Sequence, residues 1–232
     1  MKSFAAQLKW QFTLLQKNSV ITVSIAVTLF YGILLYFLRD VGSLDQVLVG
    51  LILNDPSVIG YFFIALAIYT EVKHDILPAL FVTPVNVHRF LLAKTIAISV
   101  IGVICSLGLV ISVKGLDFDM LNFIIGATGI CVLSALLGLY MLPFASEFLK
   151  FSLFSIPLFL AFVNIPVLQY LGAIDFGFFR YLLPVQGSLD LIDHAISGTS
   201  VNLVYDYLSL LVLIPLFYWL AYRHFSQKVV QQ

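Results

Sequence analysis

The sequence predicts an all-α integral membrane protein with six transmembrane helices. Of its 232 residues 61% are hydrophobic and only 10% are charged, whereas a soluble domain carries about 25% charged residues. The charged residues lie between apolar runs of about 20 residues, which is the length that crosses the hydrocarbon core of a bilayer. Most of these runs lack the polar face that a helix on the surface of a soluble domain shows.

We expect a single transmembrane domain over residues 1–232, with spans at residues 20–38, 56–73, 90–113, 121–144, 151–171 and 205–222. The second span is the least clear, because Asn54, Asp55 and Pro56 interrupt its apolar stretch. Asp55 suits the capping position of a helix and Pro56 its first position, so the span is predicted to begin at Pro56. A single helix from Val47 with a kink at Pro56 is the alternative.

Two further segments are predicted to lie at the membrane surface. Residues 1–19 mix lysines with apolar side chains and include Trp10, a pattern typical of an amphipathic interfacial helix. Residues 172–202 are too polar to span, and they predict an outer re-entrant or interfacial helical segment before the last span. Asp190, Asp193 and His194 lie there within one helical turn, and we interpret them as a solvated face rather than a metal or acid–base site.

Basic residues predict the orientation, because cytoplasmic loops are enriched in Lys and Arg. Six crossings place both termini on one side. The opposite side holds Arg39, Lys114 and Arg180. The side of the termini holds the other nine: Lys2, Lys9, Lys17, Lys73, Arg89, Lys94, Lys150, Arg223 and Lys228. We therefore expect a multi-pass protein of the cell (plasma) membrane with both termini in the cytoplasm.

The interval between the second and third spans, residues 74–89, predicts a short cytoplasmic helix. Pro78 and the pair Thr83-Pro84 each suit the start of a new helix. One apolar edge forms at helical spacing, from Ile76, Leu77, Leu80 and Phe81. A short exposed helix with an apolar edge can dock into a groove on another protein.

This interval resembles the ABC-2 family of ATP-binding-cassette permeases. In that family a Glu after the second span is followed by Leu-Leu-Val-(Ser/Thr)-Pro-Val, a basic residue and a Lys. The residues that match in register are Glu71, Leu77, Leu80, Phe81, Val82, Thr83, Pro84 and Val85, with Arg89 and Lys94 after them. The departures are Asp75 and Ile76, where Gly-Thr is usual, and Pro78, where an acid is usual. Residues 182–186 (Leu-Leu-Pro-Val-Gln) also resemble the fluoroquinolone-export permease subgroup.

The resemblance implies that this chain is the permease subunit of an ATP-driven exporter whose ATPase is a separate polypeptide. Its partners would be ABC ATPase subunits, a second permease copy or a related permease, and the lipid bilayer. The ATPase would hold ATP and Mg, with no cofactor on this chain. The residues implied in coupling to the ATPase are Glu71, Ile76, Leu77, Leu80, Phe81, Val82, Thr83 and Pro84.

The remaining residues bound the chemistry. The sequence holds no Gly-rich phosphate loop with Gly-Lys-Ser/Thr and no catalytic or metal-ligand constellation, so we expect no enzyme activity. Its net charge of zero and lack of a basic patch argue against nucleic acid.

The predicted spans carry no Lys, Arg, Asp or Glu at mid-depth, which favours an apolar or amphipathic substrate such as a drug, lipid or peptide. Asn164 is their clearest polar group, and it would line a pathway or bond a neighbouring helix. A membrane-embedded transferase and a non-transporting membrane anchor are the alternative functions.

Overall fold

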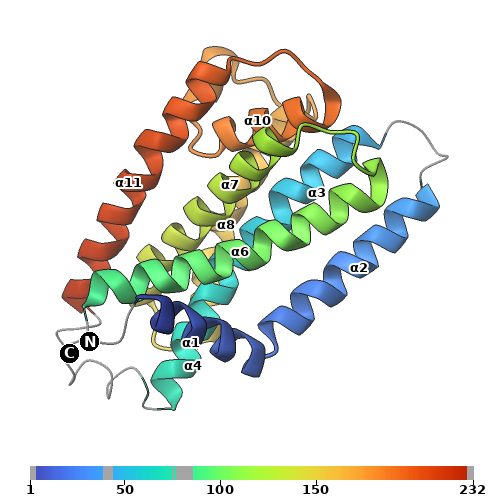
Figure 1. Cartoon of the computed structure of the whole chain (residues 1–232). Helices are drawn as coiled ribbons and strands as arrows, with labels where there is room; N and C mark the ends of the chain where they lie inside the picture. The colour runs from blue at the N-terminus through green and yellow to red at the C-terminus, as the bar shows by residue number, and fades with distance from the viewer. Residues whose placement is uncertain (1–3, 39–43, 75, 77–85, 229–232) are drawn as a thin grey trace.

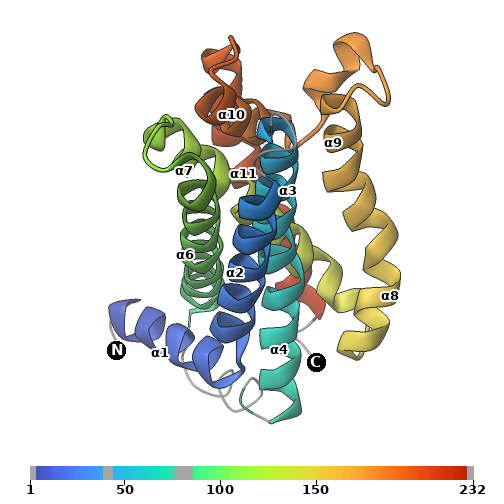
Figure 2. The same ribbon diagram turned by 90° about the vertical axis from the view of Figure 1, so that its right-hand side faces the viewer.

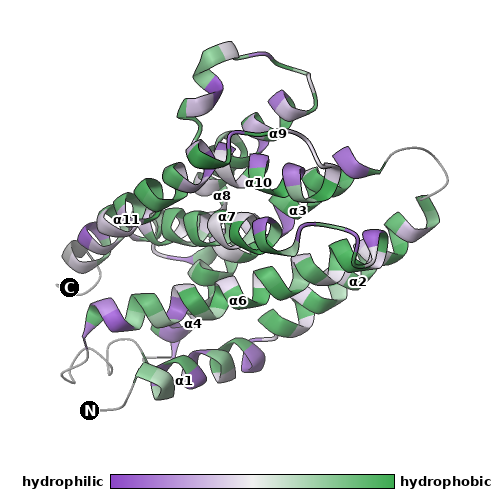
Figure 3. Ribbon diagram, turned by 45° about the horizontal axis from the view of Figure 1, so that its top comes forward, coloured by the Kyte–Doolittle hydropathy of each residue, from purple (hydrophilic) through white to green (hydrophobic). Residues whose placement is uncertain are grey.

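The computed structural model describes residues 4–38, 44–74, 76 and 86–228, and these form helices joined by short loops, with no strand among them (Figure 1). Within these residues six helices are long and apolar enough to cross a membrane. Hydrophobic residues run along the helices, while hydrophilic ones gather towards the helix ends (Figure 3). The predicted all-α membrane fold is confirmed.

The long helices pack together as a bundle, and shorter helices lie at both of its ends (Figures 1 and 2). Their bounds are α1 Phe4–Lys17, α2 Val20–Leu38, α3 Asp45–Val58, the π-helix η1 Ile59–Phe63, α4 Ile64–Lys73, α6 Val87–Lys114, α7 Met120–Met141, the 3₁₀-helix η2 Leu142–Phe144, α8 Phe148–Phe159, the π-helix η3 Leu160–Asn164, α9 Ile165–Tyr170, the 3₁₀-helix η4 Gly177–Leu182, α10 Gln186–Ser197 and α11 Leu203–Lys228.

The second span begins earlier than the sequence predicts. Elements α3, η1 and α4 form one continuous helix of 29 residues from Asp45 to Lys73, and Pro56 lies inside it. The prediction of a helix start at Pro56 is therefore wrong, and the alternative of one helix passing through Pro56 is the correct one. A break at this depth would leave several backbone groups unpaired in lipid, whereas an internal proline removes one donor. The π-helix η1 follows directly, and such widened turns accommodate local irregularities in a helix.

Helix α7 packs at the centre of the bundle, and its glycines set how closely its neighbours approach. A Cβ atom on Gly138 would lie 2.5 Å from the carbonyl oxygen of Tyr61 in η1. A Cβ atom on Gly126 would lie 3.0 Å from the carbonyl oxygen of Ser188 in α10. Small residues of this kind let helix backbones come close together in membrane proteins. Helix α7 thus holds η1 on one face and α10 on another.

The two ends of the bundle differ. At the α1 end, helix α1 lies across the bundle where α2 and α6 begin (Figure 2), and it buries Gln11, Leu14 and Leu15 while Trp10 stays exposed. At the α10 end lie α10 and the loops around it, far from α1 in both views. Nine of the twelve residues of α10 are buried, so α10 is inserted into the bundle.

Asp193 of α10 is buried, so the interpretation of a solvated face is wrong for this residue, whereas Asp190 and His194 are partly exposed. Its carboxylate accepts hydrogen bonds from the hydroxyls of Tyr170, Ser197 and Thr199, at 2.7, 2.9 and 2.7 Å. His194 Nδ1 lies 2.6 Å from the carbonyl oxygen of Thr199. These bonds tie α10 to the end of α9 and to the loop that precedes α11. Spacing along one helix cannot reveal Tyr170 and Thr199 as partners, because they lie outside α10.

Candidate functional site

A buried ion pair joins α4 and α6, the helices on either side of residues 74–86. Glu71 lies in the last turn of α4, and Lys94 lies two turns into α6. Lys94 Nζ is 2.7 Å from Glu71 Oε1, and the two side chains are only 0% and 3% exposed. Both residues match the family pattern, but nothing in the sequence pairs them with each other. The contact holds the last turn of α4 against the early part of α6.

Because it is buried, this ion pair costs more free energy to break than a pair on the surface. Two buried charges lose their hydration, and removing either one leaves the other uncompensated, which costs about 3–5 kcal/mol. The pair therefore resists separation of α4 from α6. Helix α4 is the end of the second candidate span, Asp45–Lys73, and α6 is the third.

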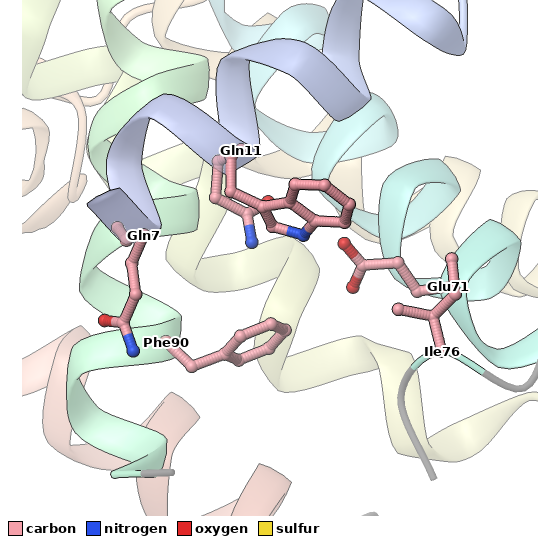
Figure 4. A pocket seen from close by; sticks show the side chains of 7 residues that line it. Gln7, Gln11, Glu71, Ile76 and Phe90 are labelled. Atoms are coloured by element: carbon pink, nitrogen blue, oxygen red, sulfur yellow. The ribbon is translucent and has the colours of Figure 1, made fainter. Parts of the chain in front are cut away.

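A small cavity of about 40 Å³ lies beside the ion pair, between α1, α4 and α6 (Figure 4). Gln7 and Gln11 face it from one side, and Glu71 and Ile76 from the other. Glu71 Oε2 and Gln7 Oε1 are buried without a hydrogen-bond partner among the described residues. Trp10, Ile76, Phe90 and Ala93 also line it, so its wall is mostly apolar, and a cavity of this volume has room for about one water molecule. Helix α1 thus covers the ion pair and reaches the base of the connecting segment.

A second contact fastens the start of α6 to α11. His88 Nδ1 and the Tyr218 hydroxyl are joined by a hydrogen bond of 3.0 Å. The His88 ring also stacks on Tyr222, with centroids 3.6 Å apart and planes inclined by 14°. Tyr218 and Tyr222 are four residues apart, so they share one face of α11. Sequence reasoning missed this contact, because no local pattern links His88 to a helix 130 residues later.

Two of the predicted coupling residues lie within the described structure. Glu71 forms the ion pair and Ile76 lines the cavity. The predicted short helix and its other residues lie outside the described residues, so their part in coupling stays a prediction: Leu77, Leu80, Phe81, Val82, Thr83 and Pro84.

Asn164 contacts a neighbouring helix. Its Oδ1 accepts a hydrogen bond of 3.3 Å from Asn54 Nδ2, which links η3 to α3. This geometry favours the helix-contact alternative over the pathway alternative.

Beside Asn54, Asp55 lies ten residues inside the helix that begins at Asp45, about 15 Å along its axis. The expectation that the spans hold no acid at mid-depth rested on a helix starting at Pro56, and the longer helix places Asp55 inside the second candidate span.

The chain matches the Fluoroquinolones export permease protein family over residues 2–232. Two relatives, both named fluoroquinolones export permease protein, come from two strains of Mycobacterium tuberculosis. Each is 28% identical to this chain over 151 residues, which make up 65% of this chain and 63% of the relative. The matched part therefore spans less than two thirds of each relative. Because the family match extends over nearly the whole sequence, the chain belongs to the fluoroquinolones export permease protein family.

Proposed function

We propose that this chain is the permease subunit of an ATP-driven exporter and that its ATPase is a separate polypeptide. Membership of an export permease family supports the permease role and argues against the membrane-transferase alternative. The buried Glu71–Lys94 pair carries the coupling part of the proposal, because it joins two membrane-spanning helices at the base of one connecting segment.

The coupling step follows from this arrangement. The ATPase, which holds ATP and Mg, binds the apolar edge predicted within residues 74–89. Closure of two ATPase subunits displaces this segment in each of two paired permeases. The ion pair passes the displacement to α4 and α6 together, and the spans rock to open a path outward. The cargo is an apolar or amphipathic molecule, such as a drug, lipid or peptide, taken from the cytoplasm or the inner leaflet.

The α1 end is proposed to face the cytoplasm of the cell, with the α10 end outside. The distribution of Lys and Arg supports this orientation. A cysteine at the exposed Asp117, on the α6–α7 turn, is expected to react with a membrane-impermeant reagent on intact cells, and one at the exposed Lys9 only after permeabilisation. The reverse pattern contradicts the orientation.

ATP hydrolysis by the complex tests the coupling proposal. The tagged chain is purified from its native membranes in mild detergent, and ATP hydrolysis of the purified sample is measured. Leu80→Asp should abolish the hydrolysis, because the purified chain would no longer carry its ATPase. Replacing the buried leucine with a charged side chain removes roughly 1.5–3 kcal/mol of binding free energy from burial in the partner's groove. Leu116→Asp is the matched control, because Leu116 is 77% exposed at the α10 end.

Hydrolysis that survives in Leu80→Asp, or that is missing from the purified wild-type complex, contradicts the proposal. The membrane-anchor alternative is separated by reconstituting the complex in vesicles. An exporter couples its ATP hydrolysis to movement of an amphipathic compound across the bilayer, and an anchor does not.

A further inference from the structure

One carboxylate, that of Asp55, lies deep within the membrane-spanning region. The helix from Asp45 to Lys73 has 29 residues, which corresponds to about 42 Å and matches a bilayer with its headgroup regions. Its middle residue is Ile59, so Asp55 lies about 6 Å along the axis from the centre. The hydrocarbon core extends about 15 Å to either side, and Asp55 is therefore inside it.

This carboxylate lacks the ion pair that the acids near both ends of its helix have. Glu71 pairs with Lys94, and Asp45, at the end of the same helix, pairs with Lys114. Oδ2 of Asp55 is buried without a hydrogen-bond partner, and the described residues offer it no ion pair. An ionisable side chain in a membrane is costly, and such residues commonly mark a substrate or ion path. The absence of a structural partner points to a partner that comes from outside the chain.

The surroundings of Asp55 suit an amphipathic ligand. The residue is partly exposed, and so are Leu51 and Val58, which lie four positions before it and three after it on the same helix face. A ligand can therefore meet a carboxylate flanked by apolar side chains. Asp206 is also buried without partners on its carboxylate oxygens, but it is 0% exposed, so no ligand reaches it in this arrangement.

A single carboxylate suits a protonated amine better than a divalent metal ion. Divalent metal ions of the Ca²⁺ and Mg²⁺ kind require about six or more oxygen ligands. The described residues contain no group of three His, Cys, Asp or Glu side chains that could hold a metal. A protonated amine requires one acceptor with a negative charge, and its hydrogen bonds to a carboxylate are roughly twice as strong as neutral ones. An apolar body on the amine would lie against Leu51 and Val58.

We propose that Asp55 forms a recognition site for a protonated amine on a lipophilic molecule, and that it gives the cargo of this permease its preference for cationic amphiphiles. The inference rests on the proposed export function, which it narrows from apolar or amphipathic molecules in general. The Asn54–Asn164 hydrogen bond of 3.3 Å sits at the neighbouring position and holds α3 against η3. It keeps the backbone that carries Asp55 in place.

Binding to the chain alone tests the site and needs no ATPase. The probes are dansylcadaverine, whose primary amine is protonated at pH 7, and its N-acetyl derivative, which is neutral. Their binding to the full chain in phosphatidylcholine nanodiscs is measured by dansyl fluorescence, with empty nanodiscs subtracted. The wild type should favour the amine by about tenfold or more, since hydrogen bonds to charged groups contribute about 1.5–3 kcal/mol.

Asp55→Asn should bring the ratio of the two affinities close to one, and Asp55→Glu should keep the preference for the amine. Asp117→Asn is the matched control, because it removes an exposed acid at the α10 end and should leave the ratio unchanged. Asp55→Asn is expected to melt no lower than the wild type, because it removes an uncompensated charge. Asp55→Ser gives a second neutral variant should Asp55→Asn fail to fold.

A wild type that binds both probes equally, or neutral variants that keep the wild-type ratio, overturns the proposal. The second result would mean that the preference for the amine arises elsewhere in the chain. The coupling proposal is tested by a different measurement, since ATP hydrolysis that survives in Leu80→Asp would contradict it. The two proposals are therefore refuted by different measurements.

Discussion

Replacing Lys94 with methionine tests the central element of the site. Methionine has a similar length without the charge, so Lys94→Met leaves Glu71, which is 3% exposed, without its cation. Glu71 Oε2 already lacks a partner, and the change removes the partner of Oε1 as well. Breaking a buried pair from one side costs about 3–5 kcal/mol. In a domain of about 150–250 residues this lowers the melting temperature by about 6–20 °C.

Two further variants separate charge from packing. Glu71→Met combined with Lys94→Met removes both charges, and it should recover most of the lost stability, because a buried pair and an apolar replacement are often nearly equivalent. Lys114→Met is the control at the other end of α6. Its pair with Asp45 has a similar length, 2.8 Å, but the side chains are 27% and 34% exposed. It should cost at most about 1 kcal/mol.

The assay is thermal unfolding of the four proteins in one detergent, followed by circular dichroism. The reasoning is refuted if Lys94→Met melts no lower than Lys114→Met, since burial would then add nothing to the pair. It is also refuted if the double variant melts as low as Lys94→Met, because loss of packing rather than an uncompensated charge would explain the effect.

Three more changes test other contacts through the same melting measurement. Gly138→Ala should destabilise the chain by about 1–3 kcal/mol, because its Cβ would lie 2.5 Å from a carbonyl oxygen of η1; an unchanged melting temperature contradicts that packing. Asp193→Ala removes the acceptor of three hydrogen bonds and should cost about 2–3 kcal/mol; a loss well below 1 kcal/mol would mean that water replaces them. Burial raises the pKa of Asp190, so its contribution to stability is present below the unfolded pKa of about 3.9 and is lost as pH rises through the folded pKa. Asp190→Asn should therefore gain stability relative to the wild type between pH 4 and pH 7, and a constant difference contradicts this.

Local sequence signals gave a wrong prediction where the same residues occur both at the start of a helix and inside one. Asp55 followed by Pro56 is a sound start signal for a helix in water, where the preceding turn can be solvated. Inside a membrane the backbone of that turn must stay hydrogen-bonded, so the helix continues from Asp45 to Lys73. For the same reason Asp55 falls outside the second span that the sequence predicts. The interpretation of Asp193 as solvated is wrong for a related reason. The sequence of α10 looks polar, but α3, α7 and α11 pack around the helix and bury Asp193.

The sequence by itself determined the number and type of the long helices, because apolar runs of bilayer length leave the backbone only one way to satisfy its hydrogen bonds. It also placed Glu71 and Lys94 in a recognisable pattern. Only the tertiary structure decided that these two charges meet, that Oδ2 of Asp55 has no hydrogen-bond partner among the described residues, and that Asn164 bonds Asn54. Each of these facts depends on which faces of separate helices come together. That choice is made by close packing around residues such as Gly138, and its partners are far apart along the chain.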